Sequence, residues 1–101
     1  MADTTSIAPL TQEERAQALV ELSSWKYDMG RLAFYRAFQL TDFAEAMGLM
    51  VRIAVEAEKS GHHPEWTNVY NRLEIWLTTH DAGDVSRRDI DLAKIIDKFI
   101  D

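Results

Sequence analysis

Residues 58–80 read EKSGHHPEWTNVYNRLEIWLTTH, and this stretch holds a predicted pair of strands together with all three histidines of the chain. Over residues 73–78, apolar side chains alternate with other residues, which indicates a strand with one buried face. Residues 66–70 form the preceding strand, and a tight turn at residues 71–72 joins the two. The stretch therefore predicts an antiparallel hairpin, which the chain enters through a corner at residues 61–64.

A long helix is predicted directly before this corner. Thr41 is its expected N-cap, and Asp42 places a carboxylate in the first turn, where it favours the free amides and the helix dipole. Gly61 is the expected stop after Ser60. One stripe of apolar residues recurs at helical spacing and is expected to face the core, although its methionines would also suit an adaptable binding surface. This stripe consists of Phe43, Met47, Met50, Val51 and Ala54.

Three further segments complete the predicted order of elements. A capping box at Thr11 and Glu14 begins a short helix, and residues 25–29 and 32–40 alternate as a second hairpin. Ser86 caps the last helix. The order helix, strand, strand, helix, strand, strand, helix predicts an α+β fold, with a four-stranded antiparallel sheet and three helices packed on one face.

The length of 101 residues suits a single domain over residues 1–101, with residues 1–9 as a frayed tail. Trp76 falls on the strand face opposite to the predicted core. Because an aromatic ring of this size is seldom left bare, we expect another element or a second subunit to cover it.

Composition excludes several classes of function. The chain has 11 Lys and Arg against 17 Asp and Glu, a formal charge of −6 that does not suit binding to nucleic-acid phosphates. The absence of cysteine excludes disulfides, thiolate-bound zinc and thiol catalysis. Residues 1–9 lack the basic and apolar segments of a signal peptide, and no window is apolar enough to span a membrane. We therefore expect a cytoplasmic protein with no membrane or nucleic-acid partner.

The histidines indicate proton-transfer chemistry, because imidazole titrates near neutral pH. His62 and His63 are adjacent, and Pro64 restrains the chain there to an extended form, so their side chains diverge. Divergence disfavours chelation of one metal ion but allows contact with different atoms of one flat ligand, with His80 arriving from the neighbouring strand. The nearest candidate carboxylates are Glu58 and Asp89.

Each of these residues also has a purely structural interpretation. His80 alone is more often a satisfied polar residue than a catalyst. Capping of the last helix already explains Asp89, which stands three residues after Ser86. Trp66 fits the core, and Glu58 fits a solvated helix face.

Five short motifs occur in order along the chain: EK at 58–59, HHPEW at 62–66, NVYN at 68–71, TH at 79–80 and RD at 88–89. Together they resemble the pterin-4a-carbinolamine dehydratase family over roughly residues 25–96, and the α+β order is similar to the fold of that family. Two departures stand out. Gly61 occupies a position where the family often has an acidic residue, and residues 82–85 differ from its usual spacing.

The resemblance implies a set of site residues. The catalytic set is His62, His63, His80 and Asp89. The substrate-binding set is Gly61, His62, His63, Pro64, Trp66, Thr78, Thr79, His80 and Asp81. Glu58 and Arg88 are supporting residues, and neither a metal nor another cofactor is implied, since the pterin is the substrate.

The resemblance also implies a hydro-lyase reaction, the dehydration of a 4a-hydroxytetrahydropterin to the quinonoid dihydropterin. This step recycles the pterin after aromatic amino-acid hydroxylation. We expect His62 and His80 to share the acid and base roles while His63 positions the substrate.

Two non-enzymatic functions stay open beside the enzyme. Animal members of the family are also dimerisation cofactors of a homeodomain transcription factor, so a protein-interaction module is the alternative function. A metal-binding module would require the three histidines to converge with a carboxylate. The family further implies a homodimer or homotetramer.

Overall fold

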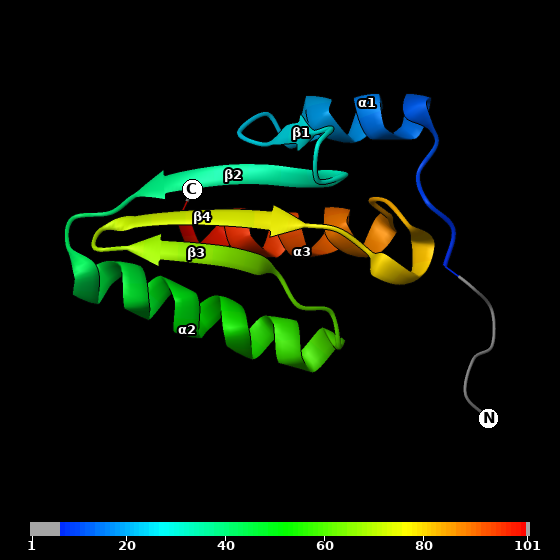
Figure 1. Ribbon diagram of the computed structural model, residues 1–101. Helices are drawn as coiled ribbons and strands as arrows, with labels where there is room; N and C mark the ends of the chain where they lie inside the picture. The colour runs from blue at the N-terminus through cyan, green and yellow to red at the C-terminus, as the bar shows by residue number, and fades with distance from the viewer. Residues whose placement is uncertain (1–6, 101) are drawn as a thin grey trace.

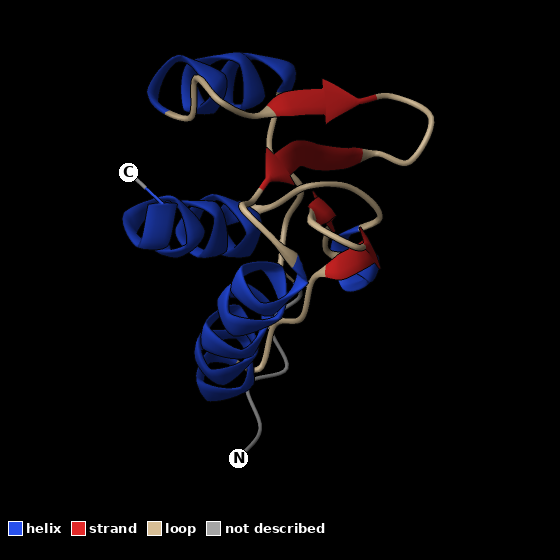
Figure 2. Ribbon diagram, turned by 90° about the vertical axis from the view of Figure 1, so that its left-hand side faces the viewer, coloured by secondary structure: helices blue, strands red, loops and turns tan. Residues whose placement is uncertain are grey.

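Three α-helices lie on one face of a four-stranded antiparallel sheet in the computed structural model, which describes residues 7–100. Figure 1 shows the order of the elements along the chain, and Figure 2 shows the helices gathered on one side of the strands. The predicted α+β fold is confirmed. The elements are α1 (Gln12–Glu21), β1 (Lys26–Asp28), β2 (Ala33–Gln39), α2 (Phe43–Ser60), β3 (Glu65–Val69), β4 (Arg72–Leu77), the 3-10 helix η1 (His80–Ala82) and α3 (Arg87–Ile100).

The sheet has the order β1-β2-β4-β3, so the last strand in sequence lies between two earlier ones. β4 pairs antiparallel with both β2 and β3, and Phe34 stands opposite Leu77 while Trp66 stands opposite Ile75. Alternation along the strands sends one set of side chains toward the helices. The antiparallel pairing also brings the start of β3 beside the end of β4, which positions the functional site.

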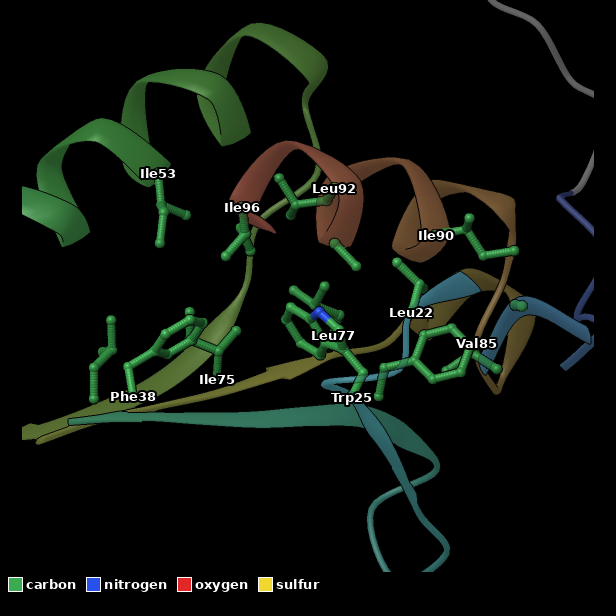
Figure 3. Close-up of a cluster of buried hydrophobic side chains, with 14 of the residues drawn as sticks. Leu22, Trp25, Phe38, Ile53, Ile75, Leu77, Val85, Ile90, Leu92 and Ile96 are labelled. Atoms are coloured by element: carbon green, nitrogen blue, oxygen red, sulfur yellow. The ribbon is translucent and has the colours of Figure 1, made fainter. Parts of the chain in front are cut away.

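The core fills the space between the sheet and the helices. Figure 3 shows Phe38, Ile75 and Leu77 on the strands facing Ile53 of α2 and Ile96 of α3. All five of these side chains are buried. Other buried members of the cluster are Ala18, Leu22, Trp25, Phe34, Leu49, Leu73, Val85, Ile90, Leu92 and Ala93.

The predicted core-facing stripe of α2 is wrong except at Met50, which is partly buried and packs against the core. Phe43, Met47 and Val51 are 48%, 40% and 56% exposed. The buried stripe is instead Ala46, Leu49, Ile53 and Ala57. The helix is apolar on two neighbouring stripes, and helical spacing alone does not say which one packs.

The ends of α2 confirm its predicted length and correct its first residue. Asp42, not Thr41, is the N-cap, and its side chain accepts a hydrogen bond from the Glu45 amide at 2.8 Å. Gly61 ends the helix as expected, in the left-handed region with φ 67°, and its amide donates to the carbonyls of Ala57 and Glu58. A residue without Cβ adopts this conformation without strain.

One detail of the hairpins differs from the prediction, and the cover expected over Trp76 is provided by another part of the same chain. The turn between β3 and β4 falls on Tyr70 and Asn71, and Arg72 is already in β4, opposite Val69. Trp76 is half-buried without a second subunit. The guanidinium of Arg31 lies 3.8 Å from its ring centroid.

Of the tail predicted over residues 1–9, residues 1–6 lie outside the described residues. Leu10 is bound to the segment before α3, because its amide donates to the Val85 carbonyl at 2.9 Å. Among residues 7–100, no helix has both the length and the apolar character needed to cross a membrane.

Candidate active site

Three segments that are distant in sequence meet at one end of the sheet. The corner after α2 carries His62 and His63, and the segment after β4 carries His80 on η1 rather than at the end of a strand as predicted. The start of α3 supplies Asp89. The helix stop at Gly61 turns the chain back toward the sheet, and the β3–β4 pairing brings the two histidine segments together.

His62 is the buried histidine of the site. Its Nε2 lies 2.6 Å from Oδ1 of Asp89, whose side chain has no exposed surface. An ionised carboxylate can only accept, so Nε2 carries the hydrogen and Nδ1 keeps a lone pair in the neutral ring. Because the Asp89 side chain is fully buried, it contacts His62 but not solvent.

The second oxygen of Asp89 accepts two hydrogen bonds. Oδ2 accepts from the Thr79 hydroxyl at 2.7 Å and from the Ser86 amide at 2.9 Å. The Ser86 hydroxyl accepts from the Arg88 amide at 3.2 Å and lies 2.6 Å from the Thr79 hydroxyl. One carboxylate therefore caps α3 and also binds His62, so the capping interpretation of Asp89 does not exclude its contact with the histidine.

The other two histidines are exposed and also have carboxylate partners. Nε2 of His63 lies 2.9 Å from Oε1 of Glu58, and the two side chains are 61% and 81% exposed. Nε2 of His80 lies 2.9 Å from Oε2 of Glu65. The predicted divergence of His62 and His63 is thus observed, with one ring directed into the protein and the other at the surface.

All three rings share one orientation relative to their partners. Each presents Nε2 to a carboxylate, and within residues 7–100 no group forms a hydrogen bond with any of the three Nδ1 atoms. Such pairing fixes the ring and favours the tautomer with hydrogen on Nε2. Each ring can therefore use Nδ1 to exchange a proton with a bound molecule.

The histidines line one cavity of about 230 Å³. Its walls contain most of the predicted site residues, namely Gly61, His62, His63, Thr78, Thr79, His80, Asp81 and Arg88. A second cavity of about 310 Å³ adjoins it and shares Thr78 and His80. A larger cavity between α2 and the end of α3 holds no titratable group beyond Glu45 and Arg52, so size alone does not identify the site.

Some predicted site residues do not line this cavity. Trp66 packs against the hydrophobic core, which agrees with the structural interpretation of that residue. Pro64 is half-buried at the corner, and Glu58 reaches the site only through His63. Among the described residues, no cluster of three or more His, Asp or Glu side chains is arranged to hold a metal ion.

One partner of the histidines, Glu65, was not assigned a role from the sequence, although it binds His80. An available signal for Glu65 was strand pairing, since an antiparallel hairpin must bring the start of its first strand beside the end of its second. The expected strand began one residue later, at Trp66.

A model of the family described as pterin 4 alpha carbinolamine dehydratase matches residues 8–99. The chain belongs to this family. Its members are dehydratases, which are hydro-lyases, and the family resemblance seen in the sequence is confirmed. A protein of Rhizorhabdus wittichii, provisionally named as a pterin-4-alpha-carbinolamine dehydratase, is 55% identical over 92 residues, which are 91% of this chain and 95% of that protein.

Other pterin 4 alpha carbinolamine dehydratase relatives agree in length and fold. One from Novosphingobium aromaticivorans, also provisionally named, is 48% identical over 94% of this chain and 99% of its own. A crystal structure from Brucella melitensis, described as a transcriptional coactivator/pterin dehydratase, superposes with a TM-score of 0.89 at 40% identity. It covers 92% of this chain and 99% of that one.

Proposed function

We propose that this protein dehydrates a pterin-4a-carbinolamine, 4a-hydroxytetrahydrobiopterin, to the quinonoid dihydropterin and water, in pterin recycling after aromatic amino-acid hydroxylation. The observation that carries the proposal is the arrangement of three imidazoles around one cavity, each with Nε2 on a carboxylate. Family membership supplies the substrate class. The reaction needs no redox partner, because it only removes water.

Loss of water from the carbinolamine requires two proton transfers. One proton goes to the departing 4a-hydroxyl as its C–O bond breaks, and one leaves N5 as the new C=N bond forms. In our proposal, His62 and His80 divide these acid and base roles, and His63 positions the substrate. Asp89 acts through His62, since it is buried beneath that ring.

The remaining walls of the cavity would hold the pterin. Gly61 exposes backbone at the corner, and Thr78, Asp81 and Arg88 offer polar groups around the histidines. The flat ring carries several donors and acceptors, so a polar cavity of this kind suits it. No cofactor enters this proposal.

Single alanine variants of His62, His63 and His80, assayed on enzymatically generated carbinolamine, test the proposal. We expect turnover to fall about 10²- to 10⁴-fold for His62→Ala and His80→Ala, the usual contribution of a positioned acid or base. His63→Ala should mainly raise KM. Lys98→Ala, on the exposed surface of α3, is the control. Undiminished turnover in all three histidine variants would exclude histidine catalysis.

We also infer that the protein forms a homodimer or homotetramer through α2. Four outward apolar side chains are spaced every four residues and are between 40% and 56% exposed: Phe43, Met47, Val51 and Val55. Residues at this spacing form one continuous ridge, and such ridges pack against a second helix of the same kind. The occupant we propose is α2 of a second copy.

A protein-interaction module remains the alternative function. It is favoured by the description of the Brucella relative as a coactivator and by the same apolar ridge of α2. The two functions separate experimentally. A His62→Ala variant that loses turnover but still binds a partner protein would show that the interaction does not depend on this histidine of the cavity.

A further inference from the structure

His80 is the most exposed histidine, yet its ring is placed between the two adjoining cavities. Its side chain is 80% exposed, and its one side-chain partner in the part of the chain that the structure describes is Oε2 of Glu65, at 2.9 Å from Nε2. An isolated surface pair of this type is weak, because two mobile side chains must be ordered together. The pair can orient His80 only if Glu65 is itself fixed.

Glu65 is fixed from the opposite side. Its other oxygen, Oε1, accepts from Nη2 of Arg31 at 3.0 Å. The Arg31 guanidinium lies over the Trp76 ring, 3.8 Å from the centroid, and Trp76 stands directly opposite Glu65 in the β3–β4 register. Stacking of a guanidinium on tryptophan restrains the cation. The carboxylate is thus held by two cationic or donor groups, one on each oxygen.

Three further hydrogen bonds, all to Asp28, tie this assembly to the sheet. The Trp76 indole donates to Oδ2 of Asp28 at 3.1 Å, and Oδ1 of the same carboxylate accepts from the amides of Gly30 and Arg31. The turn between β1 and β2 therefore presents Arg31 in a fixed position. A line of contacts runs from β1 through Trp76 and Glu65 to His80.

The charge state of Glu65 agrees with this role. Burial by itself would raise the pKa of Glu65, but the hydrogen bonds from Arg31 and His80 outweigh it and hold that pKa below its usual value. The carboxylate is therefore ionised at neutral pH and can only accept hydrogen bonds. The other charged or titratable groups that line the two cavities around His80 are His62, His63, Asp81 and Arg88.

We propose that Glu65 is a positioning residue of the dehydratase reaction, which holds His80 as the tautomer with hydrogen on Nε2 and leaves Nδ1 to exchange the proton with the substrate. Arg31, stacked on Trp76, holds Glu65 in turn. This proposal rests on the proposed function for its reaction, but its structural part, the fixed tautomer, is independent of any activity.

The test compares Glu65→Gln with Glu65→Asp and with Glu74→Gln. Glu74 is the matched control, because it is a carboxylate on the same sheet face whose partners include Tyr35 and Thr67 but no histidine. Long-range ¹H–¹⁵N spectra at roughly pH 8.5, about two units above the ordinary imidazole pKa, report the tautomer of each neutral ring. Turnover and KM are measured on the same samples.

In the wild type and in Glu74→Gln, we expect His80 as the Nε2–H tautomer. In Glu65→Gln, we expect a mixture of tautomers, because an amide can present either oxygen or NH₂ to the ring. We expect kcat to fall about 10- to 100-fold, in the range reported for lost orienting partners of histidines, with a smaller change in KM. Glu65→Asp keeps the charge and should recover part of this loss.

An unchanged tautomer in Glu65→Gln would overturn the proposal, and so would a changed tautomer with wild-type kcat. If Glu65→Gln does not fold, Arg31→Gln replaces it, with the same expected loss of a single tautomer. A wild type without turnover would instead refute the proposed function, whereas the spectra would still show whether Glu65 fixes the ring.

Discussion

At the scale of single residues, Asp89 connects stability to the proposed chemistry. Its carboxylate is buried and receives hydrogen bonds from His62, Thr79 and the Ser86 amide. Three donors around two oxygens leave little unused acceptor capacity, which is how a buried carboxylate is tolerated. The side chain that would orient His62 is thus also the one that caps the start of α3.

We expect Asp89→Asn to damage folding and turnover together. An amide of the same shape must direct NH₂ toward a donor, either His62 or the Thr79–Ser86 pair, and so it leaves buried groups unpaired. The free energy of unfolding, measured by urea titration, should fall by about 2–4 kcal/mol. Turnover should fall at least about tenfold.

The control for this change is Asp91→Asn on the same helix. Asp91 is 58% exposed and pairs with Arg87 at 3.3 Å, so its loss should cost at most about 0.5 kcal/mol. Equal destabilisation by the two variants would contradict the special role of the buried carboxylate.

At the scale of elements, the edge strand β1 is joined to the loop after η1. The Tyr27 hydroxyl donates to Oδ1 of Asp84 at 2.9 Å, and Asp84 also accepts from the Val85 amide. Thr79 pairs with Asp84 in an isolated bridge. β1 thereby supports the segment that carries His80 from outside the site.

This link predicts a loss of stability in alkali. Burial raises the pKa of Tyr27, the bond to Asp84 and its charge raise it further, and Arg15 opposes them in part. A raised pKa means that folding favours the protonated phenol. The Tyr27 hydroxyl therefore stabilises the fold fully at pH values below its pKa in the unfolded chain, about 10. This stabilisation is lost as the pH rises through the higher pKa of Tyr27 in the folded protein.

Urea unfolding at roughly pH 8 and roughly pH 11 checks this prediction, since these values lie on either side of the tyrosine pKa. Between these two pH values, the free energy of unfolding should fall less in Tyr27→Phe than in the wild type. Part of the loss should persist, because the bond to Glu74, together with burial, also raises the pKa of Tyr35. An identical loss in the wild type and Tyr27→Phe would exclude this role for the Tyr27–Asp84 bond.

Most local features of the elements could be predicted from the sequence, although the N-cap of α2 is Asp42 rather than Thr41, and several features that depend on tertiary contacts could not. Thr11 and Gly61 each act on their own backbone neighbourhood, so their capping roles were predictable. The buried face of α2 was not, because two apolar stripes compete and only the sheet decides between them. Glu65 was missed for the same reason, as its partner lies 15 residues away across a strand pair.

At the scale of the whole molecule, the two sides of the sheet differ. The helices cover one side, while Arg31, Tyr35, Trp76 and Glu74 satisfy one another on the other side. The large exposed apolar residues outside α2 lie elsewhere on the chain, such as Met29 after β1, Val69 at the end of β3 and Tyr70 in the turn that follows. The apolar ridge of α2 is therefore the surface best suited to self-association.

We expect Val51→Glu to shift the protein to a monomer at low micromolar concentration in light scattering. A charge within the ridge would have to be buried unpaired at the interface between copies. Val20→Glu is the control, because Val20 is 79% exposed on α1 and should not affect assembly. A wild type that is already monomeric would refute self-association, and an unchanged mass in Val51→Glu would place the interface elsewhere.

The buried contact among His62, Thr79, Ser86 and Asp89 has a consequence for motion. His62, Thr79 and the Ser86–Asp89 pair come from three separate segments, so the contact opens when any of these segments moves away from Asp89. Amide exchange at Ser86, whose hydrogen is bound to Asp89, would measure how often this carboxylate releases the start of α3 in the native state. A ligand that binds only the closed form would slow this exchange, so one amide beneath the cavity can report occupancy of the site without any measurement of catalysis.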